Sequence, residues 1–319
     1  MADVSVAQTI AELLGVIIYM LYCIIRECIY LIVPRPRKSV KDKVVVLTGA
    51  GHGLGRLLAK RLCELGARCV LIDIDKGTNE AVASEIRETG QPVWAFQCDV
   101  SSEEQIKELH QRIEYEVGPV DIIINNAAIV NCLEILKLQS ARIRRNFEIN
   151  TLSHIWMIRE FLPGMKERGS GHILAISSIA GMMGTAYLTD YCASKFAVRG
   201  LMMALEEELY EQGYARKIQL TTVCPVAINT GMFHLPQTRF PWVTPILEPD
   251  TVADGVIDAL LTNQREVVLP SHIGIVNKIV SCLLPIHAVL KLQRFLSYGV
   301  SPHKETAAAD SSGDVKKDI

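Results

Sequence analysis

The stretch KVVVLTGAGHGLGR, residues 43–56, joins a short β-branched run to a loop rich in glycine. The run from Lys43 to Leu47 suits a buried parallel strand, and a helical pattern follows the loop through Leu65. Glycines at such a junction let the backbone turn tightly and approach a pyrophosphate, which rests on the positive end of the helix. A glycine-rich loop alone is weak evidence, but one between a strand and a helix predicts a dinucleotide-binding site.

A carboxylate follows the next predicted strand. Cys69–Ile72 ends at Asp73, roughly 20 residues beyond the loop, where a carboxylate can accept hydrogen bonds from both adenosine ribose hydroxyls. Because this carboxylate would repel a 2′-phosphate, we expect NAD as the cofactor rather than NADP. Asp75 could share this role, and Asp73 taken alone could also be a turn residue at a strand end.

The alternation of strand and helix continues along the chain. VWAFQCDV ends at Asp99 and Val100, VDIIINNAA ends at Asn125 and Asn126, and the segment 103–117 between them has apolar residues at helical spacing. Alternating elements of this length predict an α/β fold with a single doubly wound parallel sheet of the Rossmann type. Its ligand cleft would lie at the carboxyl ends of the strands, where these motif residues fall.

The stretch TDYCASKF, residues 189–196, separates Tyr191 from Lys195 by three small side chains. On a helix the two residues share one face, with Cβ atoms roughly 5–6 Å apart, which by itself could be an ordinary surface pair. Tyrosine that is partly ionised near pH 7 needs a pKa shift of roughly three units, or about 4 kcal/mol. One ammonium about 4 Å away at an effective dielectric near 20 supplies roughly that amount. The pair could therefore remove a proton from an alcohol.

Taken together, the motifs resemble the classical short-chain dehydrogenase/reductase family over residues 43–233. The glycine loop matches the cofactor loop of that family, Asn125-Asn126-Ala127 matches a sheet-stabilising motif, and Tyr191 with Lys195 matches the active-site pair. The cofactor contacts that the resemblance implies come from Thr48, Gly49, Gly51, Gly53, Leu54, Gly55, Asp73, Asp99, Val100, Asn126, Ala127, Tyr191, Lys195, Pro225, Val226, Ile228 and Thr230.

The same resemblance implies four catalytic residues. Tyr191 would be the acid/base, and Lys195 would lower its pKa and bind the nicotinamide ribose. Ser178, 13 residues before the tyrosine, would hydrogen-bond the substrate oxygen, and Asn150 would hold a water that links Lys195 to solvent. Tyr187, one helical turn before Tyr191, could line the substrate pocket or simply pack. Each residue alone could be structural, as a strand-end serine, a capping asparagine or a surface tyrosine.

Two positions depart from the family pattern. Ala128 replaces the glycine that usually follows Asn-Asn-Ala, which removes glycine's conformational freedom at one turn position. Val226 replaces the glycine that usually follows the proline at Pro225, in a loop that contacts the nicotinamide carboxamide in the family. We expect residues 226–230 still to make that contact, so the valine leaves the path of this loop open but does not change the class of reaction.

The first 34 residues predict a membrane anchor. The longest uncharged run, Leu13–Ile25, spans only about 20 Å as a helix, short of a roughly 30 Å hydrocarbon core. The apolar stretch beyond Arg26 and Glu27 makes the segment long enough, whether it spans, re-enters or lies in the interface. A buried soluble helix is the alternative, and the lack of a basic start argues against a cleavable signal peptide. Residues 35–42 then form a basic linker that favours the cytosolic side.

Other features bear on the compartment. The chain ends in KKDI, with Lys316 and Lys317 placed as in the dilysine retrieval signal of endoplasmic-reticulum membrane proteins. The nine cysteines are scattered without a C-x-x-C pair, so neither a disulfide framework nor a metal site is expected, and a reducing compartment fits. A net charge of −2 gives no broad field that would attract nucleic acid. We expect the catalytic body in the cytosol, at the endoplasmic reticulum or on lipid droplets.

The anchor, the RPRKSV linker, Pro225-Val226 and the NTGMF stretch resemble one membrane-associated branch of the family. That branch contains retinol dehydrogenases and 17β-hydroxysteroid dehydrogenases, so the resemblance implies a lipophilic alcohol or carbonyl substrate. Residues 43–300 would form the catalytic domain, including a proline-rich loop from His234 that could cover the substrate. Residues 273–296, broken at Pro285, could pack on the sheet edge, wall the pocket or touch the membrane. Residues 301–319 read as a disordered tail.

The apolar faces of residues 146–168 and 188–212 form a four-helix dimer interface in this family, so a homodimer is implied. The favoured function is an NAD-dependent dehydrogenase acting on a lipid alcohol. An NADPH-dependent lipid carbonyl reductase and a non-catalytic scaffold on a membrane or lipid droplet are the alternatives.

Overall fold

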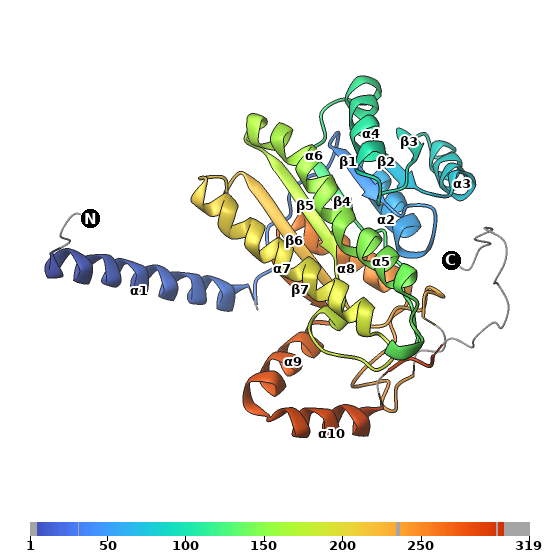
Figure 1. Cartoon of the computed structure of the whole chain (residues 1–319). Helices are drawn as coiled ribbons and strands as arrows, with labels where there is room; N and C mark the ends of the chain where they lie inside the picture. The colour runs from blue at the N-terminus through green and yellow to red at the C-terminus, as the bar shows by residue number, and fades with distance from the viewer. Residues whose placement is uncertain (1–4, 31, 234–236, 298, 303–319) are drawn as a thin grey trace. The chain divides into compact units, whose positions relative to one another are not determined.

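The computed structural model describes residues 5–30, 32–233, 237–297 and 299–302 (Figure 1). Contacts between residues divide the chain into two units, residues 1–38 and 39–319. The predicted dilysine signal, most of the predicted tail and the first residues of the predicted covering loop lie outside the described residues.

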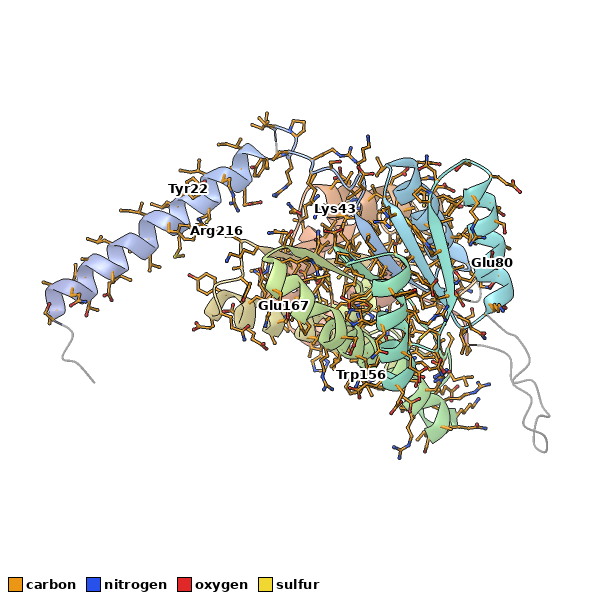
Figure 2. The ribbon with its side chains drawn as sticks, turned by 90° about the horizontal axis from the view of Figure 1, so that it is seen from above. Tyr22, Lys43, Glu80, Trp156, Glu167 and Arg216 are labelled. Atoms are coloured by element: carbon orange, nitrogen blue, oxygen red, sulfur yellow. The ribbon has the colours of Figure 1, made fainter. Side chains whose placement is uncertain are left out.

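The first unit consists of helix α1 (Val6–Ile29) and a short basic segment. Ser5 caps the helix by accepting a hydrogen bond from the backbone of Gln8. The helix is long and apolar enough to cross a membrane, and none of its described residues is buried in the protein. Its side chains project outward along the whole length, as at Tyr22 (Figure 2). The adjacent charges of Arg26 and Glu27 pair at 3.1 Å.

The second unit is built on a seven-stranded parallel sheet in the order β3-β2-β1-β4-β5-β6-β7. The strands are β1 (Val44–Thr48), β2 (Arg68–Asp73), β3 (Val93–Gln97), β4 (Ile122–Asn125), β5 (Gly171–Ile176), β6 (Ile218–Pro225) and β7 (Glu266–Leu269). The chain runs outward from β1 to β3 and then returns to β4 beside β1. This reversal confirms the predicted doubly wound sheet and places its switch point, where sheets of this kind bind ligands, at the carboxyl ends of β1 and β4.

Helices cover both faces of the sheet (Figure 1). They are α2 (Gly53–Glu64), α3 (Lys76–Arg87), α4 (Glu103–Glu116), α5 (Ser140–Phe147), α6 (Ser153–Arg168), α7 (Thr189–Glu211), α8 (Pro249–Leu261), α9 (Ser271–Leu283) and α10 (Ile286–Leu296). Val45 and Leu47 of β1 pack with α2, α3 and α8, while Val44 and Val46 pack with α4, α6 and α7. The central strand is apolar on both sides because successive residues point to opposite faces and both faces are buried.

Three features differ from the elements expected from sequence. Residues 146–168, predicted as one helix, are interrupted by a π-helical turn, η2 (Glu148–Leu152), between α5 and α6. Helix α8 and the edge strand β7 were not predicted from the sequence. The break at Pro285 does separate two helices, α9 and α10, as predicted. Short 3₁₀ turns, η1 (Ile135–Lys137) and η3 (Ile179–Gly181), complete the unit.

Candidate active site

The glycine loop connects β1 to α2, and its geometry requires glycine at two positions. A Cβ atom on Gly55 would lie 1.9 Å from the backbone oxygen of Gly49. Gly49 has φ of +66°, and a Cβ atom there would lie 2.9 Å from the Cα of Ala127. His52 is the N-cap residue of α2, but its side chain makes no capping hydrogen bond. The first backbone N–H groups of α2 are therefore left for another acceptor. The loop therefore fits the pyrophosphate of a dinucleotide.

Asp73, the carboxylate predicted to bind the adenosine ribose, lies beside this loop at the carboxyl end of β2. Its Oδ2 accepts from the backbone N–H of Gly51 at 2.9 Å, and Oδ1 accepts from that of Asp75 at 3.0 Å. Each carboxylate oxygen keeps a further lone pair for a ribose hydroxyl. The Asp75 carboxylate instead caps α3 by accepting from the backbone of Gly77 and Thr78.

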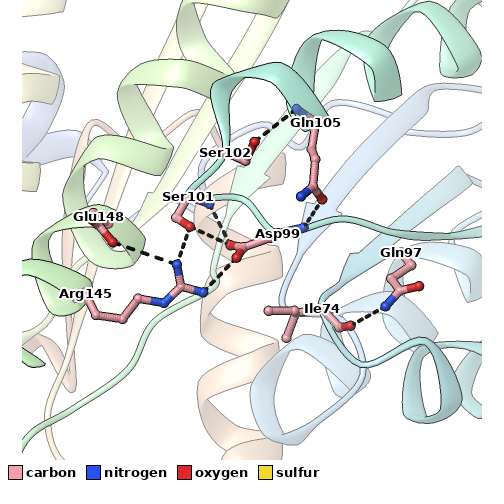
Figure 3. Close-up of polar contacts among 8 residues, drawn as sticks. All are labelled: Ile74, Gln97, Asp99, Ser101, Ser102, Gln105, Arg145 and Glu148. Atoms are coloured by element: carbon pink, nitrogen blue, oxygen red, sulfur yellow. Dashed lines mark hydrogen bonds and ion pairs between the residues drawn. The ribbon is translucent and has the colours of Figure 1, made fainter. Parts of the chain in front are cut away.

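The carboxylate of Asp99 is held by its own loop and by a residue that the sequence did not single out (Figure 3). Oδ1 accepts from the backbone and hydroxyl of Ser101 at 3.0 and 2.7 Å, and Oδ2 accepts from Arg145 at 2.8 Å. Burial raises the pKa of Asp99, but the hydrogen bonds from Ser101 and Arg145 outweigh it and hold the pKa below its usual range. Arg145 also pairs with Glu148 at 3.8 Å, so α5 and η2 brace the loop that precedes α4.

Two predicted cofactor residues, Thr48 and Asn126, join the carboxyl end of β1 to the chain that leaves β4. The Thr48 hydroxyl oxygen accepts from the backbone N–H groups of Asn126 and Ala127 at 3.0 and 3.1 Å. The Asn126 amide donates to the carbonyls of Thr48 and Gly49. Ala128 is not among the described residues with positive φ, so alanine fits this turn and the departure from glycine brings no backbone strain there.

The predicted catalytic pair lies on a buried face of α7. Tyr191 and Lys195 are 4% and 1% exposed, and the Lys195 Nζ is 5.7 Å from the centroid of the tyrosine ring. The ammonium donates to the backbone oxygen of Ile176, at the end of β5, at 2.9 Å. Burial lowers the pKa of Lys195 to about 8, so the ammonium persists only up to mildly alkaline pH.

Ser178 lies just after β5, where it caps η3. Its hydroxyl oxygen accepts from the backbone of Ala180 at 3.1 Å, and the hydroxyl donates to the carbonyl of Pro225 at 3.5 Å. Its neighbour Ser177 donates to the backbone oxygen of Lys195 at 3.0 Å. The two serines therefore tie the end of β5 to β6 and α7, close to the catalytic pair.

Asn150 lies within the π-helical turn η2 and is fully buried. Its side chain bonds both backbone groups of Ile129, donating to the oxygen and accepting from the N–H, each at 2.8 Å. It also donates to the Ser194 hydroxyl at 3.2 Å. π-Helical turns recur at functional sites because the extra residue redirects one side chain and frees one carbonyl. Here the turn aims Asn150 at the chain that leaves β4.

A cover over Tyr191 brings together segments far apart in sequence. The Phe233 ring meets the Tyr191 ring edge to face at a centroid distance of 5.7 Å. Val300 belongs to the same cluster, and the backbone oxygen of Ser301 accepts from Cys132 at 3.1 Å. This approach of residues 299–301 was not predicted, because it depends on a single antiparallel bridge between Gln237 and Gly299.

The remaining predicted residues follow the carboxyl ends of β1, β3 and β6, at the same edge of the sheet. Val226 packs in a small core with Ile179 and Cys224, while Ile228 bridges to Leu247. Thr230 lies near the glycine loop, since a Cβ atom on Gly53 would be 3.5 Å from it. The side chain of Leu54 and that of Val100 are buried in the two main cores, so any cofactor contact there comes from the backbone.

Tyr187 differs from expectation. It precedes α7 with φ of +65° and is 37% exposed, so it is not one helical turn from Tyr191 as the sequence suggested. Among the described residues, no group of three or more His, Cys, Asp or Glu side chains could hold a metal ion.

Comparison with known proteins assigns this architecture to a family. The family model for short chain dehydrogenases matches residues 43–238. Rat (Rattus norvegicus) 17-beta-hydroxysteroid dehydrogenase 13 is 37% identical over 92% of this chain and 98% of its own length. Mouse (Mus musculus) epidermal retinol dehydrogenase 2 is 37% identical over 86% of this chain and 89% of its own length.

Solved structures agree. A metagenomic short-chain oxidoreductase in complex with NADP superposes with a TM-score of 0.61 at 30% identity, over 72% of this chain and 97% of that one. A Burkholderia phymatum short-chain dehydrogenase/reductase in complex with NAD shares the fold, with a TM-score of 0.69 at 22% identity, over 85% of this chain and 100% of that one. The chain belongs to the short-chain dehydrogenase/reductase family.

Proposed function

We propose that the protein is an NAD-dependent dehydrogenase that oxidises a lipophilic secondary or allylic alcohol. The observation that carries this proposal is the placement of Tyr191 and Lys195 on one buried face of α7, bound to the end of β5 just before Ser178, at the same carboxyl edge of the sheet as the glycine loop after β1. A coating or scaffolding role makes no demand on such an arrangement.

The chain's own groups account for the proton. The Ser178 hydroxyl donates to the substrate oxygen and orients it, and the Tyr191 phenolate takes the hydroxyl proton as the C–H bond releases hydride. The ammonium of Lys195 stabilises the phenolate, because it lies near the ring in a site that excludes water. Bound oxidised nicotinamide supplies the hydride acceptor. Asn150, which anchors the backbone of Ile129, would order a water toward Lys195 for proton exit.

The cofactor preference rests on Asp73. A carboxylate at the end of β2 can accept hydrogen bonds from the ribose hydroxyls and would repel a 2′-phosphate. The similar solved structures include one NADP complex and one NAD complex. An NADPH-dependent reductase is therefore the second candidate. Asp73→Ala should narrow the preference between NAD and NADP; a wild-type protein that prefers NADP would contradict the proposal.

We infer the substrate class from the apolar residues that cover Tyr191 and from the relatives of this chain. The Tyr191 cover is apolar, formed by Val130, Cys132, Leu188, Cys192, Phe233 and Val300. The relatives named above are a hydroxysteroid dehydrogenase and a retinol dehydrogenase. An apolar cover selects lipids by shape, so retinoid, steroid and other lipid alcohols all belong in the test.

We place the protein at the cytosolic face of the endoplasmic reticulum or on lipid droplets. The support is α1, which is apolar and unburied, and the basic residues that follow it. Helices α9 and α10 add a second apolar surface with exposed Ile275, Val276, Ile279, Leu283, Leu284, Ile286, Leu290 and Phe295. Lys278, Lys291 and Arg294 on the same two helices could face lipid head groups.

A homodimer is part of this proposal. Phe196, Met203 and Tyr210 repeat every seven residues along α7 and are 44–69% exposed, with Leu152 of η2 also exposed. Such an apolar stripe on a helix favours a partner. Sedimentation equilibrium of the detergent-solubilised protein tests this, since a monomer mass would exclude the dimer.

The decisive experiment offers a panel of retinoid, steroid and fatty alcohols to microsomes that contain the protein and follows NADH fluorescence. Tyr191→Phe should reduce the rate on an accepted alcohol at least 100-fold, which corresponds to about 2.7 kcal/mol of transition-state stabilisation. Tyr210→Phe removes a phenol from the exposed part of the same helix and should leave the rate unchanged. No NADH formation by the wild type with any member of the panel would support the scaffold alternative, and equal measurable rates for wild type and Tyr191→Phe would exclude Tyr191 as the acid/base.

A further inference from the structure

A buried histidine that the proposed chemistry does not use lies near the catalytic lysine. His154 is in the first turn of α6, four residues after Asn150, and is 1% exposed. Neither of its ring nitrogens has a hydrogen-bond partner among the described residues. Buried polar groups are seldom unpaired in folded proteins, because the lost hydration destabilises the fold. The presence of a histidine at this buried position therefore needs an explanation.

Two hydrogen bonds join the π-helical turn before His154 to the residue that precedes Lys195. One turn before His154, the Thr151 hydroxyl donates to the backbone oxygen of Ser194 at 3.1 Å. The Asn150 amide donates to the Ser194 hydroxyl at 3.2 Å. Ser194 is the residue before Lys195 on α7. Burial first, and the positive charge of Lys195 second, lower the pKa of His154 to about 3. The imidazole is therefore neutral at physiological pH and lies within the field of the ammonium.

A second unpaired polar group faces the same side of the sheet. The amide nitrogen of Asn125, at the end of β4, is buried without a partner among the described residues. Ile123, two residues earlier, packs with Met157 of α6 and Val198 of α7, and strand alternation directs Asn125 to that side as well. Two unpaired side chains from different elements therefore lie on the α6–α7 side, toward the end of the sheet where Lys195 is bound.

The groups that act on Lys195 include no carboxylate among the described residues. The Tyr191 ring lies near it on the same helix, and His154 of α6 and Cys224 of β6 interact with it electrostatically. Burial raises the pKa of the Cys224 thiol to about 12, so this thiol is neutral. The charged pair beyond it, Arg199 with Glu266, is closed at 2.8 Å. The positive charge of Lys195 is therefore stabilised by neutral hydrogen-bond acceptors and not by a carboxylate among the described residues.

We propose that His154 is a positioning residue for Lys195: its neutral imidazole accepts a hydrogen bond from one water that itself accepts a hydrogen bond from the ammonium, and this link holds the charge beside Tyr191. An ammonium carries three donors, of which the carbonyl of Ile176 takes one. A second neutral acceptor stabilises the charged form without competing for the proton. This inference rests on the proposed function of Tyr191 and Lys195.

The test compares pH profiles of kcat and KM for one accepted alcohol at saturating NAD, using the full-length protein. His154→Leu should lower kcat at least tenfold with KM changed less than twofold. It should also move the alkaline fall in kcat to lower pH by about one unit, because the unsupported ammonium loses its proton sooner. His154→Gln, whose amide oxygen can accept the same bond, should restore most of both. Met157→Leu, a buried change on the same helix, should leave the profile as in wild type.

A folded His154→Leu protein with the wild-type kcat and alkaline limb would overturn the inference and leave the histidine as a packing residue. If leucine prevents folding, His154→Phe keeps a ring without an acceptor, and its alkaline limb decides in the same way. These results are separable from the proposed function. Activity that survives in Tyr191→Phe contradicts the proposed function, whereas a silent His154→Leu in an enzyme that Tyr191→Phe inactivates contradicts only the role of His154.

Discussion

At the scale of single residues, Gly55 shows how little freedom the dinucleotide loop has. A Cβ atom would lie 1.9 Å from a backbone oxygen, which cannot move aside as a flexible side chain could. We expect Gly55→Ala to weaken NAD binding at least tenfold, which is about 1.4 kcal/mol, because the loop must open. Gly184→Ala is the control, since a Cβ atom there meets nothing within 4 Å. Isothermal titration with NAD measures both, and unchanged affinity in Gly55→Ala would contradict the loop geometry.

Lys195 illustrates a residue that is buried at the expense of stability. Its pKa is lowered by burial to about 8 in the folded protein, against 10.5 for the free side chain, so the folded state disfavours the charge by about 3 kcal/mol. That penalty is complete below pH 8. Between pH 8 and 10.5 the unfolded chain binds more protons, so the free energy of unfolding rises with pH.

Lys195→Met lacks this titration. We therefore expect the free energy of unfolding of wild type to rise by about 3 kcal/mol relative to Lys195→Met between pH 7.5 and 10.5. Urea denaturation of the detergent-solubilised proteins at the two pH values measures it. Lys217→Met, at a more exposed position, is the control. Parallel curves for wild type and Lys195→Met would show that the lysine is not held in a desolvated site.

At the scale of elements, the ion pair between Asp99 and Arg145 couples α5 to the loop before α4. Without the guanidinium, the partly buried carboxylate keeps only Ser101, and the loop that carries Val100 loses a support (Figure 3). We expect Arg145→Met to destabilise the fold by about 1 kcal/mol and to weaken NAD binding several-fold. Arg144→Met, an exposed neighbour, should do neither. Thermal unfolding and NAD titration measure the two effects, and equal values for the two variants would show that the pair is not a support.

At the scale of the whole molecule, the division into residues 1–38 and 39–319 separates an apolar helix from the catalytic unit. Deleting residues 1–34 should leave oxidation of a water-soluble alcohol within twofold of the full chain, since no predicted site residue is removed. Oxidation of an alcohol dissolved in phospholipid vesicles should fall at least fivefold, together with flotation of the protein on those vesicles. Full flotation of the truncated protein would show instead that α9 and α10 suffice for attachment.

The motifs with short spacing were readable from sequence because local geometry decides them. Tyr191 and Lys195 share a face on any helix, and a β-branched run before glycines reads as a strand entering a turn. The order of such runs is enough to predict a doubly wound sheet, and the sheet found here confirms it.

What only the tertiary structure decided are the contacts between segments that lie far apart along the chain. Arg145 on Asp99, Phe233 against Tyr191 and Val300 in the same cluster join residues 42 to 109 positions apart, and no local periodicity encodes such neighbours. The π-helical turn at Asn150 is of the same kind, because its extra residue is held by Ile129 and Ser194 rather than by helix propensity. Sequence spacing determined which groups could react, while packing of distant segments determined how dry their surroundings are and therefore which of them keeps its charge.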